Sequence, residues 1–296
     1  MRNFEALNQV QHKMKVLPFK IPKPEFDTLI FQEDKDDFFF DKLHQHEEIQ
    51  LSYIIEGEGT LIVGDTINYY KPDDVLVIGS HIPHVFKSDM QSNKSSHMLT
   101  LFFTESSFGD VFFQLEELKE SNNFFKRSKQ GFKVMSHKKS LKALFFQLKS
   151  ASKMRQFILL LELLQTISKA NYKSLSSFIY DKTYTDIEGN RMRDVFDYTM
   201  DNYNFNISLN TIAEVANMTK NAFCKYFKKR TNKTYVQFLN ELRIDHACKL
   251  LLTQKELSVI EIAERTGFNN LSNFNRQFKT IKRMNPSEFR KQKRLF

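Results

Sequence analysis

Residues 262–279 read IAERTGFNNLSNFNRQFK, and residues 212–228 read IAEVANMTKNAFCKYFK, so one pattern occurs twice near the end of the chain. In each copy an Ile-Ala pair marks the inner face of a short helix. Two Phe residues four positions apart mark the inner face of a second one. The turn between them falls at Asn217 in the first copy and at Gly267 in the second, where a positive φ costs little. The sequence therefore predicts two helix-turn-helix units.

A third helix is expected between the two units. Residues 235–252 carry Phe, Leu and Ala side chains at helical spacing without a Pro or Gly to interrupt them. One continuous helix would fix the separation of the two units.

The positive charge of the chain lies in the same region. The chain has 296 residues and a net charge of +9, and residues 191–296 hold 20 Lys and Arg against 10 Asp and Glu. A basic domain suits the phosphate backbone of nucleic acid. A solvated basic surface without a partner would have the same composition, so charge alone does not decide between them.

An ordered signature runs through the second copy and the helix before it. It comprises Arg243-x-x-x-Ala247-x-x-Leu250-Leu251, Ile262-Ala263-x-x-x-Gly267-Phe268, Ser272-x-Phe274-x-Arg276-x-Phe278-Lys279 and Asn285-Pro286-Ser287-Glu288-Phe289-Arg290. With it, residues 191–290 resemble the DNA-binding domain of the AraC family of bacterial regulators. The resemblance implies a transcription regulator that binds double-stranded DNA. The family's glycine before the proline segment is replaced by Asn232 in the first copy and by Met284 in the second, and Met does not readily take a left-handed turn.

The second helix of each unit is expected to enter a major groove of the DNA. Its outward side chains would contact bases, and we assign this role to Thr219, Asn221, Lys225, Asn270, Ser272, Asn273 and Arg276. Arg276 is the strongest candidate, because a guanidinium can donate two hydrogen bonds to guanine. Phosphate contacts are assigned to Lys220, Lys228, Lys229 and Lys279. The alternative is that these polar residues only cover a solvated surface.

The N-terminal half shows two further patterns. From about residue 28 to 103, short apolar runs alternate with turns rich in Gly and Asp, which indicates an antiparallel sandwich or barrel. From about residue 106 to 177, apolar residues recur at three- and four-residue spacing, which predicts amphipathic helices. Their apolar face would pack on the barrel or pair with a second copy of the chain.

A weaker resemblance concerns the barrel. His44-Gln45-His46, residues 53–59, Pro72-Asp73-Asp74 and Pro83-His84 resemble a cupin-type sensor domain. In metal-binding cupins a carboxylate four residues after the His pair completes the site, and Gln50 stands there. A neutral amide is a poorer ligand, so no metal is expected. The histidines are then ordinary polar side chains at a barrel mouth, or they form an effector pocket lined by His44, His46, Tyr53 and His84.

The predicted fold class is α+β with two domains. Residues 1–185 would form a cupin-like β-barrel with following helices, and residues 186–296 an all-α domain with two helix-turn-helix units joined by a linker helix. No cofactor is expected, since the two cysteines, Cys224 and Cys248, have no zinc-site spacing. No stretch approaches the ~20 apolar residues of a membrane span, so we expect a cytoplasmic protein.

Three functions remain open at this point. The first is a transcription regulator that responds to a small-molecule effector in the barrel and is not an enzyme. The second is a metal-dependent cupin enzyme fused to a DNA-binding domain, and the third is a DNA-binding protein without an effector, whose barrel only dimerises. Candidate partners are double-stranded DNA, an unidentified effector, RNA polymerase and a second copy of the chain.

Overall fold

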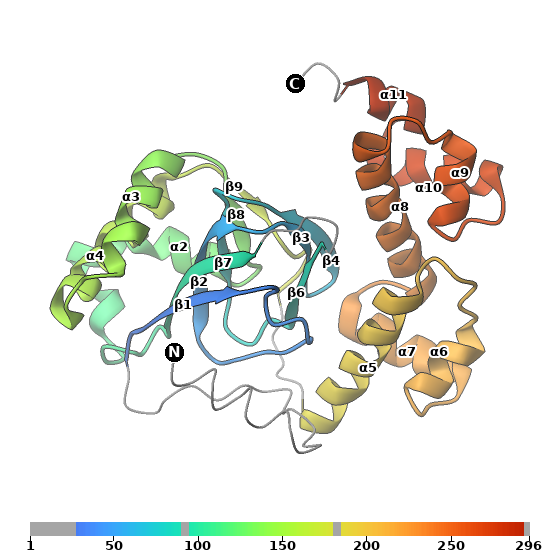
Figure 1. The fold of residues 1–296 in the computed structure, drawn as a ribbon. Coiled ribbons are helices and arrows are strands. Elements are labelled where there is room, and N and C mark those ends of the chain that lie inside the picture. Colours follow the sequence, from blue (N-terminus) through green and yellow to red (C-terminus); the bar gives the residue numbers. More distant parts are fainter. Residues whose placement is uncertain (1–27, 90–94, 180–184, 293–296) are drawn as a thin grey trace.

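The computed structural model describes residues 28–89, 95–179 and 185–292. Figure 1 shows a β-barrel in the middle, a layer of helices on one side of it, and a second helical region on the other. None of the helices in these described ranges combines the length and the apolar character that crossing a bilayer requires. The α+β fold class with two domains is confirmed.

The barrel consists of two antiparallel sheets. The larger has the strand order β1-β7-β2-β5-β8-β9, and the smaller has the order β4-β3-β6. The strands are β1 (Ile30–Asp36), β2 (Ile49–Glu56), β3 (Gly59–Val63), β4 (Thr66–Tyr70), β5 (Val75–Ile78), β6 (His84–Ser88), β7 (Ser96–Phe103), β8 (Phe132–Val134) and β9 (Tyr172–Ser174).

Strands β8 and β9 lie within the stretch that was predicted to be helical. Phe132 and Val134 are buried while Lys133 between them is less so, and β8 pairs with the edge of β5. An alternation over three residues is too short to predict a strand. These residues form a strand because they pair with β5, which is distant in the sequence.

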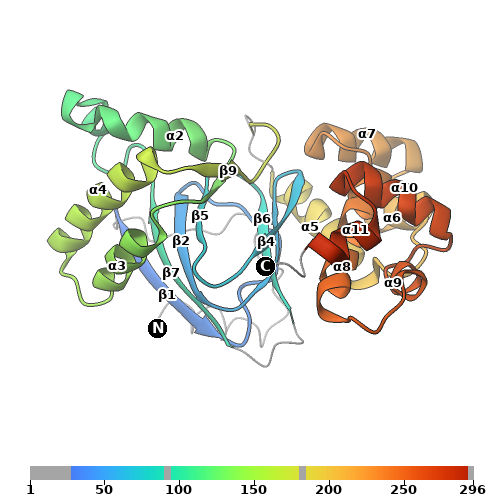
Figure 2. The same cartoon turned by 90° about the horizontal axis from the view of Figure 1, so that it is seen from above.

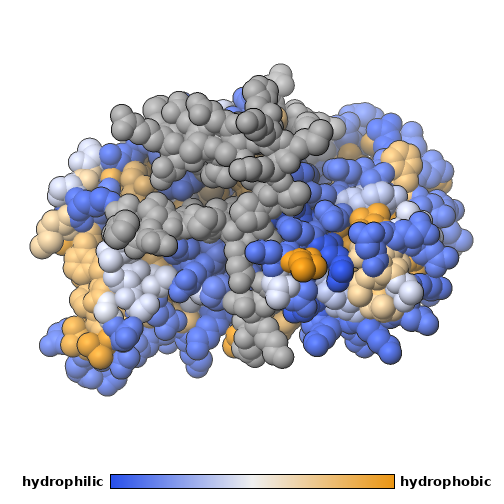
Figure 3. All heavy atoms as spheres, turned by 90° about the horizontal axis from the view of Figure 1, so that it is seen from below, coloured by the Kyte–Doolittle hydropathy of each residue, from blue (hydrophilic) through white to orange (hydrophobic). Residues whose placement is uncertain are grey.

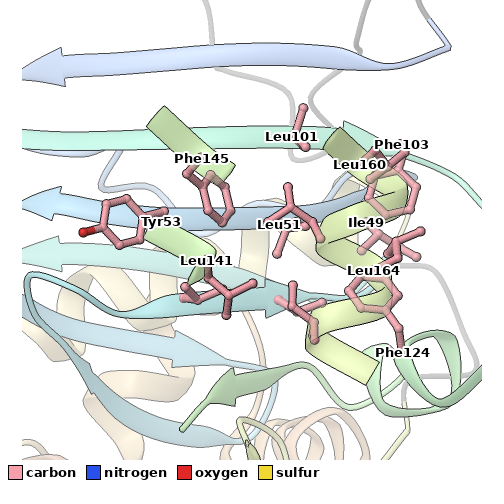
Figure 4. Packing of buried hydrophobic residues seen from close by; sticks show 14 of the residues in the cluster. Ile49, Leu51, Tyr53, Leu101, Phe103, Phe124, Leu141, Phe145, Leu160 and Leu164 are labelled. Atoms are coloured by element: carbon pink, nitrogen blue, oxygen red, sulfur yellow. The ribbon is translucent and has the colours of Figure 1, made fainter. Parts of the chain in front are cut away.

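The side chains of β2 alternate between two faces, as they must in a strand. Ile49, Leu51 and Tyr53 point outward and pack on the helical layer, as Figure 4 shows. Ile54 instead joins the core between the two sheets. The layer contains the short 3-10 helices η1 (Phe112–Gln114) and η2 (Glu116–Ser121), and the helices α2 (Asn122–Ser128), α3 (Lys138–Leu148) and α4 (Lys153–Lys169).

The apolar faces predicted for this layer are confirmed by burial. Leu141 and Phe145 of α3, and Leu160 and Leu164 of α4, are at most 1% exposed and pack in one cluster with the outer face of β2. The helices therefore cover the larger sheet, and the smaller sheet is left for the other helical region.

The C-terminal region contains both predicted units. The helices are α5 (Asp186–Asn202), α6 (Leu209–Val215), α7 (Lys220–Thr231), α8 (Tyr235–Thr253), α9 (Val259–Arg265), α10 (Leu271–Lys282) and α11 (Pro286–Gln292). Helices α6 and α7 form the first unit, α9 and α10 form the second, and α8 is the continuous linker helix.

The turns inside and after the units take left-handed conformations. Asn217 has φ 51° and Gly267 has φ 83°, so both turns lie where the sequence placed them. After the first unit Asn232 is left-handed, with φ 54°. After the second unit the left-handed residue is Arg283, with φ 61°, and not Met284. The expectation for Met284 was wrong by one position, because α10 ends at Lys282 and its cap follows directly.

The two units have separate apolar cores. The first unit shares its cluster with Leu43, Ile62 and Val85 of the barrel, whereas the cluster of the second unit draws on residues 244–289 among those described. Packing thus crosses the domain boundary that we place between residues 185 and 186, and this boundary stays a prediction.

Candidate nucleic-acid interface and histidine cluster

Helices α7 and α10 each have a buried and an exposed face. Phe223 and Phe227 of α7, and Phe274 and Phe278 of α10, are fully buried. The opposite faces carry the candidate DNA contacts, of which Asn273 is partly buried and the others are exposed: Thr219, Lys220, Asn221, Lys225, Lys228, Lys229, Asn270, Ser272, Asn273, Arg276 and Lys279. Each unit thus presents amide, hydroxyl and cationic groups on one helix face, which is the chemistry that base edges and phosphates require.

Two of the candidates also begin the helices on which they lie. The hydroxyl of Thr219 accepts a hydrogen bond from the Ala222 amide at 3.4 Å, and Oδ1 of Asn270 accepts one from the Asn273 amide at 3.1 Å. Both are N-cap residues of their helices. They therefore position the helix start, whose partial positive charge suits a phosphate, in addition to any contact with a base.

Arg276 is held in place by a neighbour one turn earlier. Its Nη2 donates a hydrogen bond to Oδ1 of Asn273 at 3.0 Å. With Lys279, Thr280 and Arg283 it lines a shallow hollow on α10. Three cationic side chains around one hollow give this part of α10 a positive surface.

The structure brings the three predicted histidines together. We call His44, His46 and His84 the histidine cluster: all are buried, and their ligand atoms lie within 4.8 Å of one another. Each Nδ1 lies 2.8 Å from a backbone carbonyl, that of Lys42, Glu48 and Ile82 respectively. A carbonyl can only accept, so Nδ1 carries a proton, and the lone pair of a neutral ring lies on Nε2.

Gln50 lies against the cluster. Its side-chain amide is 3.3 Å from Nε2 of His46 and 3.1 Å from Nε2 of His84, and its other end meets Ser52 at 3.0 Å. The hydroxyl of Ser52 in turn lies 2.9 Å from the hydroxyl of Thr100, within hydrogen-bond distance. When the amide NH2 faces the rings, it donates to both of these Nε2 lone pairs and its oxygen accepts from Ser52.

The donor set differs at one position from that of a four-ligand cupin metal centre. Three anchored imidazoles have the geometry of metal ligands, because backbone carbonyls orient them from behind. Gln50, however, supplies no negative charge to compensate a buried dication, and its amide already occupies two of the three Nε2 atoms. The cluster is therefore one anionic ligand short of a cupin metal centre.

Tyr53 does not belong to the histidine cluster, and its predicted place in the pocket is corrected. It lies on the opposite face of β2 from Gln50, and its ring stacks on Phe145 at 5.5 Å. Its hydroxyl donates to Oδ1 of Asp73 at 2.5 Å. Burial, followed by this contact, raises the pKa of Tyr53 above its usual value.

Polar contacts that the sequence did not predict join the barrel to the C-terminal region. Nε of Arg193 donates to the carbonyl of Leu43 at 2.9 Å, and Lys42 pairs with Asp197 at 3.0 Å. Both contacts link α5 to the segment just before His44. No motif marks these residues, because each contact joins positions about 150 apart in the chain.

A third contact joins the smaller sheet to the linker helix. Nζ of Lys249 on α8 lies 3.0 Å from Oδ1 of Asp89 and 2.9 Å from the Thr60 hydroxyl. In Figure 2, seen from above, β4 and β6 lie on the side of the barrel that faces α5 and α8. The barrel thus contacts the linker helix as well as α5.

Comparison with known proteins gives two domain matches. Residues 212–292 match a helix-turn-helix domain, and residues 40–101 match a cupin domain. The first region begins within α6 and covers the rest of both units and α8, and the second region contains the histidine cluster.

Several known proteins match parts of the chain. The uncharacterised HTH-type transcriptional regulator YdeC of Bacillus subtilis is 30% identical over 105 residues, which cover 36% of this chain and 36% of that protein. The Msm operon regulatory protein of Streptococcus mutans is 22% identical over 248 residues, which cover 82% of this chain and 84% of that protein. A solved transcriptional regulator with an AraC-type DNA-binding domain, from Chromobacterium violaceum, is 21% identical with a TM-score of 0.33, over 35% of this chain and 91% of that one.

Proposed function

We propose that this chain, which joins a cupin domain to an AraC-type double helix-turn-helix domain, is a sequence-specific DNA-binding transcription regulator that responds to a small molecule. The observation that carries the proposal is the pair of exposed polar faces on α7 and α10, each backed by two buried Phe residues. Double-stranded DNA is the partner that this chemistry suits, which would place the protein in the cytoplasm.

The two units would read two successive segments of major groove. Base contacts are assigned to Asn221, Lys225, Ser272, Asn273 and Arg276, with Thr219 and Asn270 acting at the helix starts. Phosphate contacts are assigned to Lys220, Lys228, Lys229 and Lys279. Segments read from one side of the duplex lie about one helical turn apart, roughly 34 Å along its axis.

The effector site is assigned to the histidine cluster and Gln50. Phe40 packs edge-on against His44 with ring centroids 5.0 Å apart, so residues 40–44 form a segment that contacts the cluster. The same segment carries Lys42 and Leu43, which contact α5. A ligand that shifts this segment would change the packing of α5, provided that it binds the two arrangements with different affinity.

We favour a regulator over a metal enzyme because the cluster lacks an anionic ligand. RNA polymerase and a second copy of the chain are further candidate partners. Hydrophobic surface is visible at the left of Figure 3, on the side of the helical layer. Exposed apolar side chains of this layer suit a second copy, and they include Val111, Leu115, Phe146, Met154 and Ile158.

Selection of bound sequences from random duplexes, at stated salt concentrations, tests the proposal. We expect two short half-sites about 10 base pairs apart, with affinity that falls steeply as salt rises. Salt-dependent binding to every duplex without enrichment would instead support a DNA-binding protein without sequence preference. No binding at all would refute the proposal.

A further inference from the structure

We propose that Arg243 holds the two helix-turn-helix units in one orientation and thereby sets the spacing between the two DNA segments that the chain reads. The proposal rests on the proposed function, because it concerns the same interface. It assigns a positioning role to a side chain that lies on α8 and not on either recognition helix.

The middle of α8, between the two apolar clusters, is the joint between the units, and a contact beside the helix is needed to fix its geometry. The apolar clusters of the two units do not merge, and α8 contributes Tyr235, Phe238 and Leu239 to the first cluster but Ile244, Ala247 and Leu251 to the second. A single long helix can bend or twist between two such attachments. The angle between α7 and α10 therefore depends on whatever crosses the joint beside the helix.

Arg243 crosses it at the middle of α8. Its Nε donates to the carbonyl of Tyr203 at 2.7 Å, and Nη2 donates to the carbonyl of Phe205 at 2.7 Å. Both carbonyls belong to the connection between α5 and α6, which leads into the first unit. The guanidinium also lies 5.7 Å from the ring centre of Phe268, directly after the turn of the second unit. One side chain thus contacts both units.

Gly267 makes the close approach possible. A Cβ at this position would lie 2.7 Å from the Tyr203 carbonyl and 3.0 Å from Nε of Arg243, which is too close for any side chain. The turn of the second unit is therefore pressed against the very carbonyl that Arg243 holds. A glycine here serves the contact between the units in addition to its positive φ.

A neighbouring contact supports the same connection. The ring of His246, on the next turn of α8, stacks on the ring of Tyr203 with centroids 4.0 Å apart and planes 10° apart. Tyr203 is thus fixed through both its carbonyl and its ring. Lysine could not replace Arg243, because a single ammonium group lacks the planar fork that reaches two carbonyls at once.

The first experiment measures how DNA binding depends on half-site spacing. Duplexes carry the selected half-sites at the optimal spacing, or two base pairs closer or farther apart. Their affinities are measured for the full chain with Arg243, with Arg243→Lys and with Arg243→Ala. We expect Arg243→Ala to reduce the preference for the optimal spacing roughly tenfold, since a loose joint lowers the effective concentration of one unit at its half-site. The spacing preference of Arg243→Lys should lie between those of the unmodified chain and Arg243→Ala.

The matched control is Arg265→Ala, which removes the same charge from the exposed end of α9. It should change affinity equally at every spacing. An unchanged spacing preference in Arg243→Ala would overturn the inference. If the unmodified chain selects no half-sites, the proposed function fails first, and the second measurement still tests Arg243.

That measurement needs no DNA. Spin labels are attached to the native Cys224 of α7 and to Asn275→Cys on α10, with the buried Cys248 replaced by alanine. The interlabel distance distribution should be narrow with Arg243 and clearly broader with Arg243→Ala, while the circular dichroism spectrum of each variant reports its helix content. Equal widths in two folded variants would contradict the proposal.

Discussion

The backbone carbonyl of Leu43 accepts a hydrogen bond from Nε of Arg193, a side chain that is only 7% exposed. This places a buried cation of α5 one residue from His44 of the histidine cluster. Burial lowers the pKa of Arg193, and the nearby carboxylates, with Asp197 foremost, oppose that shift. The contact therefore ties the proposed effector site to the first helix of the DNA-binding region.

Arg193→Met should break this tie while keeping an apolar stem of similar length. The Leu43 carbonyl would lose its donor, and we expect the free energy of unfolding to fall by about 1–3 kcal/mol. Amide hydrogen exchange should become faster both around Leu43 and along α5. The exposed Lys139→Met on α3 is the control and should change neither. Faster exchange along α5 alone would show that the contact does not couple the two regions.

Gln50→Glu should turn the histidine cluster into a metal site. A carboxylate would provide the missing negative charge beside three anchored imidazoles. At a metal concentration one hundred times the Kd we expect stabilisation of about 2.7 kcal/mol, observed as a rise in Tm with Ni²⁺ or Co²⁺. Adding His84→Ala should abolish the rise. Stoichiometric metal in the unmodified protein would argue for the metal-enzyme function instead.

Arg276→Ala should relax the sequence preference at one position of the second half-site. Loss of a two-point contact to a base costs about 1–3 kcal/mol of discrimination. Lys279→Ala, one turn later, should instead weaken binding to all sequences and lower the salt dependence by about one counterion. Unaltered base preference in competition binding would remove Arg276 from the set of base contacts.

Arg283→Gly should stabilise the second unit. The left-handed conformation, with φ 61°, destabilises the folded state by about 1–2 kcal/mol for a non-glycine residue. Glycine removes this strain, but its greater conformational freedom stabilises the unfolded chain and offsets part of the gain. We expect a net gain of about 0.5–1 kcal/mol in chemical denaturation. Asn232→Gly, at the matching position after the first unit, should gain less, because Asn tolerates this conformation better. A loss of stability in Arg283→Gly would mean that its side chain contributes more than its backbone costs.

His246 should make stability depend on pH. Burial, followed by the charge of Lys249, lowers the pKa of His246 from 6.5 to about 3, so the folded protein keeps the ring neutral. The unfolded chain takes up a proton below about pH 6.5, so this stability is present above that pH and is lost as the pH falls toward 3. Between pH 7 and pH 5 we expect a loss of about 2 kcal/mol. His246→Phe, which keeps the stack on Tyr203, should lose less over the same interval. Identical slopes for both proteins would exclude this role of His246.

Much of the fold was predictable because the relevant signals are local. The paired Ile-Ala and Phe positions, and the turns at Asn217 and Gly267, depend on helical spacing and on backbone preference within a few residues. The position of Tyr53 was also predictable. Strand alternation puts residue 53 opposite residues 50 and 52, and applying that rule to the cluster would have excluded Tyr53.

The contacts of Arg193, Lys249 and Arg243 were not predictable in the same way. Each of their hydrogen bonds joins a side chain to a position at least 38 residues away, and the two acceptors described for Arg243 are backbone carbonyls, which have no sequence signature. The role of Gln50 was predictable only in part. The spacing of this residue from the His pair marked it, but the hydrogen bonds from Gln50 to Ser52 and from Ser52 to Thr100 require β2 and β7 to pair in register.

The apolar core that the first unit shares with the barrel determines which parts of this molecule unfold together. Leu43, Ile62 and Val85 pack with the first unit, so the barrel and that unit should open together in native-state hydrogen exchange. The cluster of the second unit contains none of these three residues, and the described contact between this part of α8 and the barrel is the polar one of Lys249, so we expect the second unit to open at lower free energy. Unfolding would then proceed from the C-terminal end. On DNA, the second unit could release and rebind its half-site while the first remained docked to the barrel.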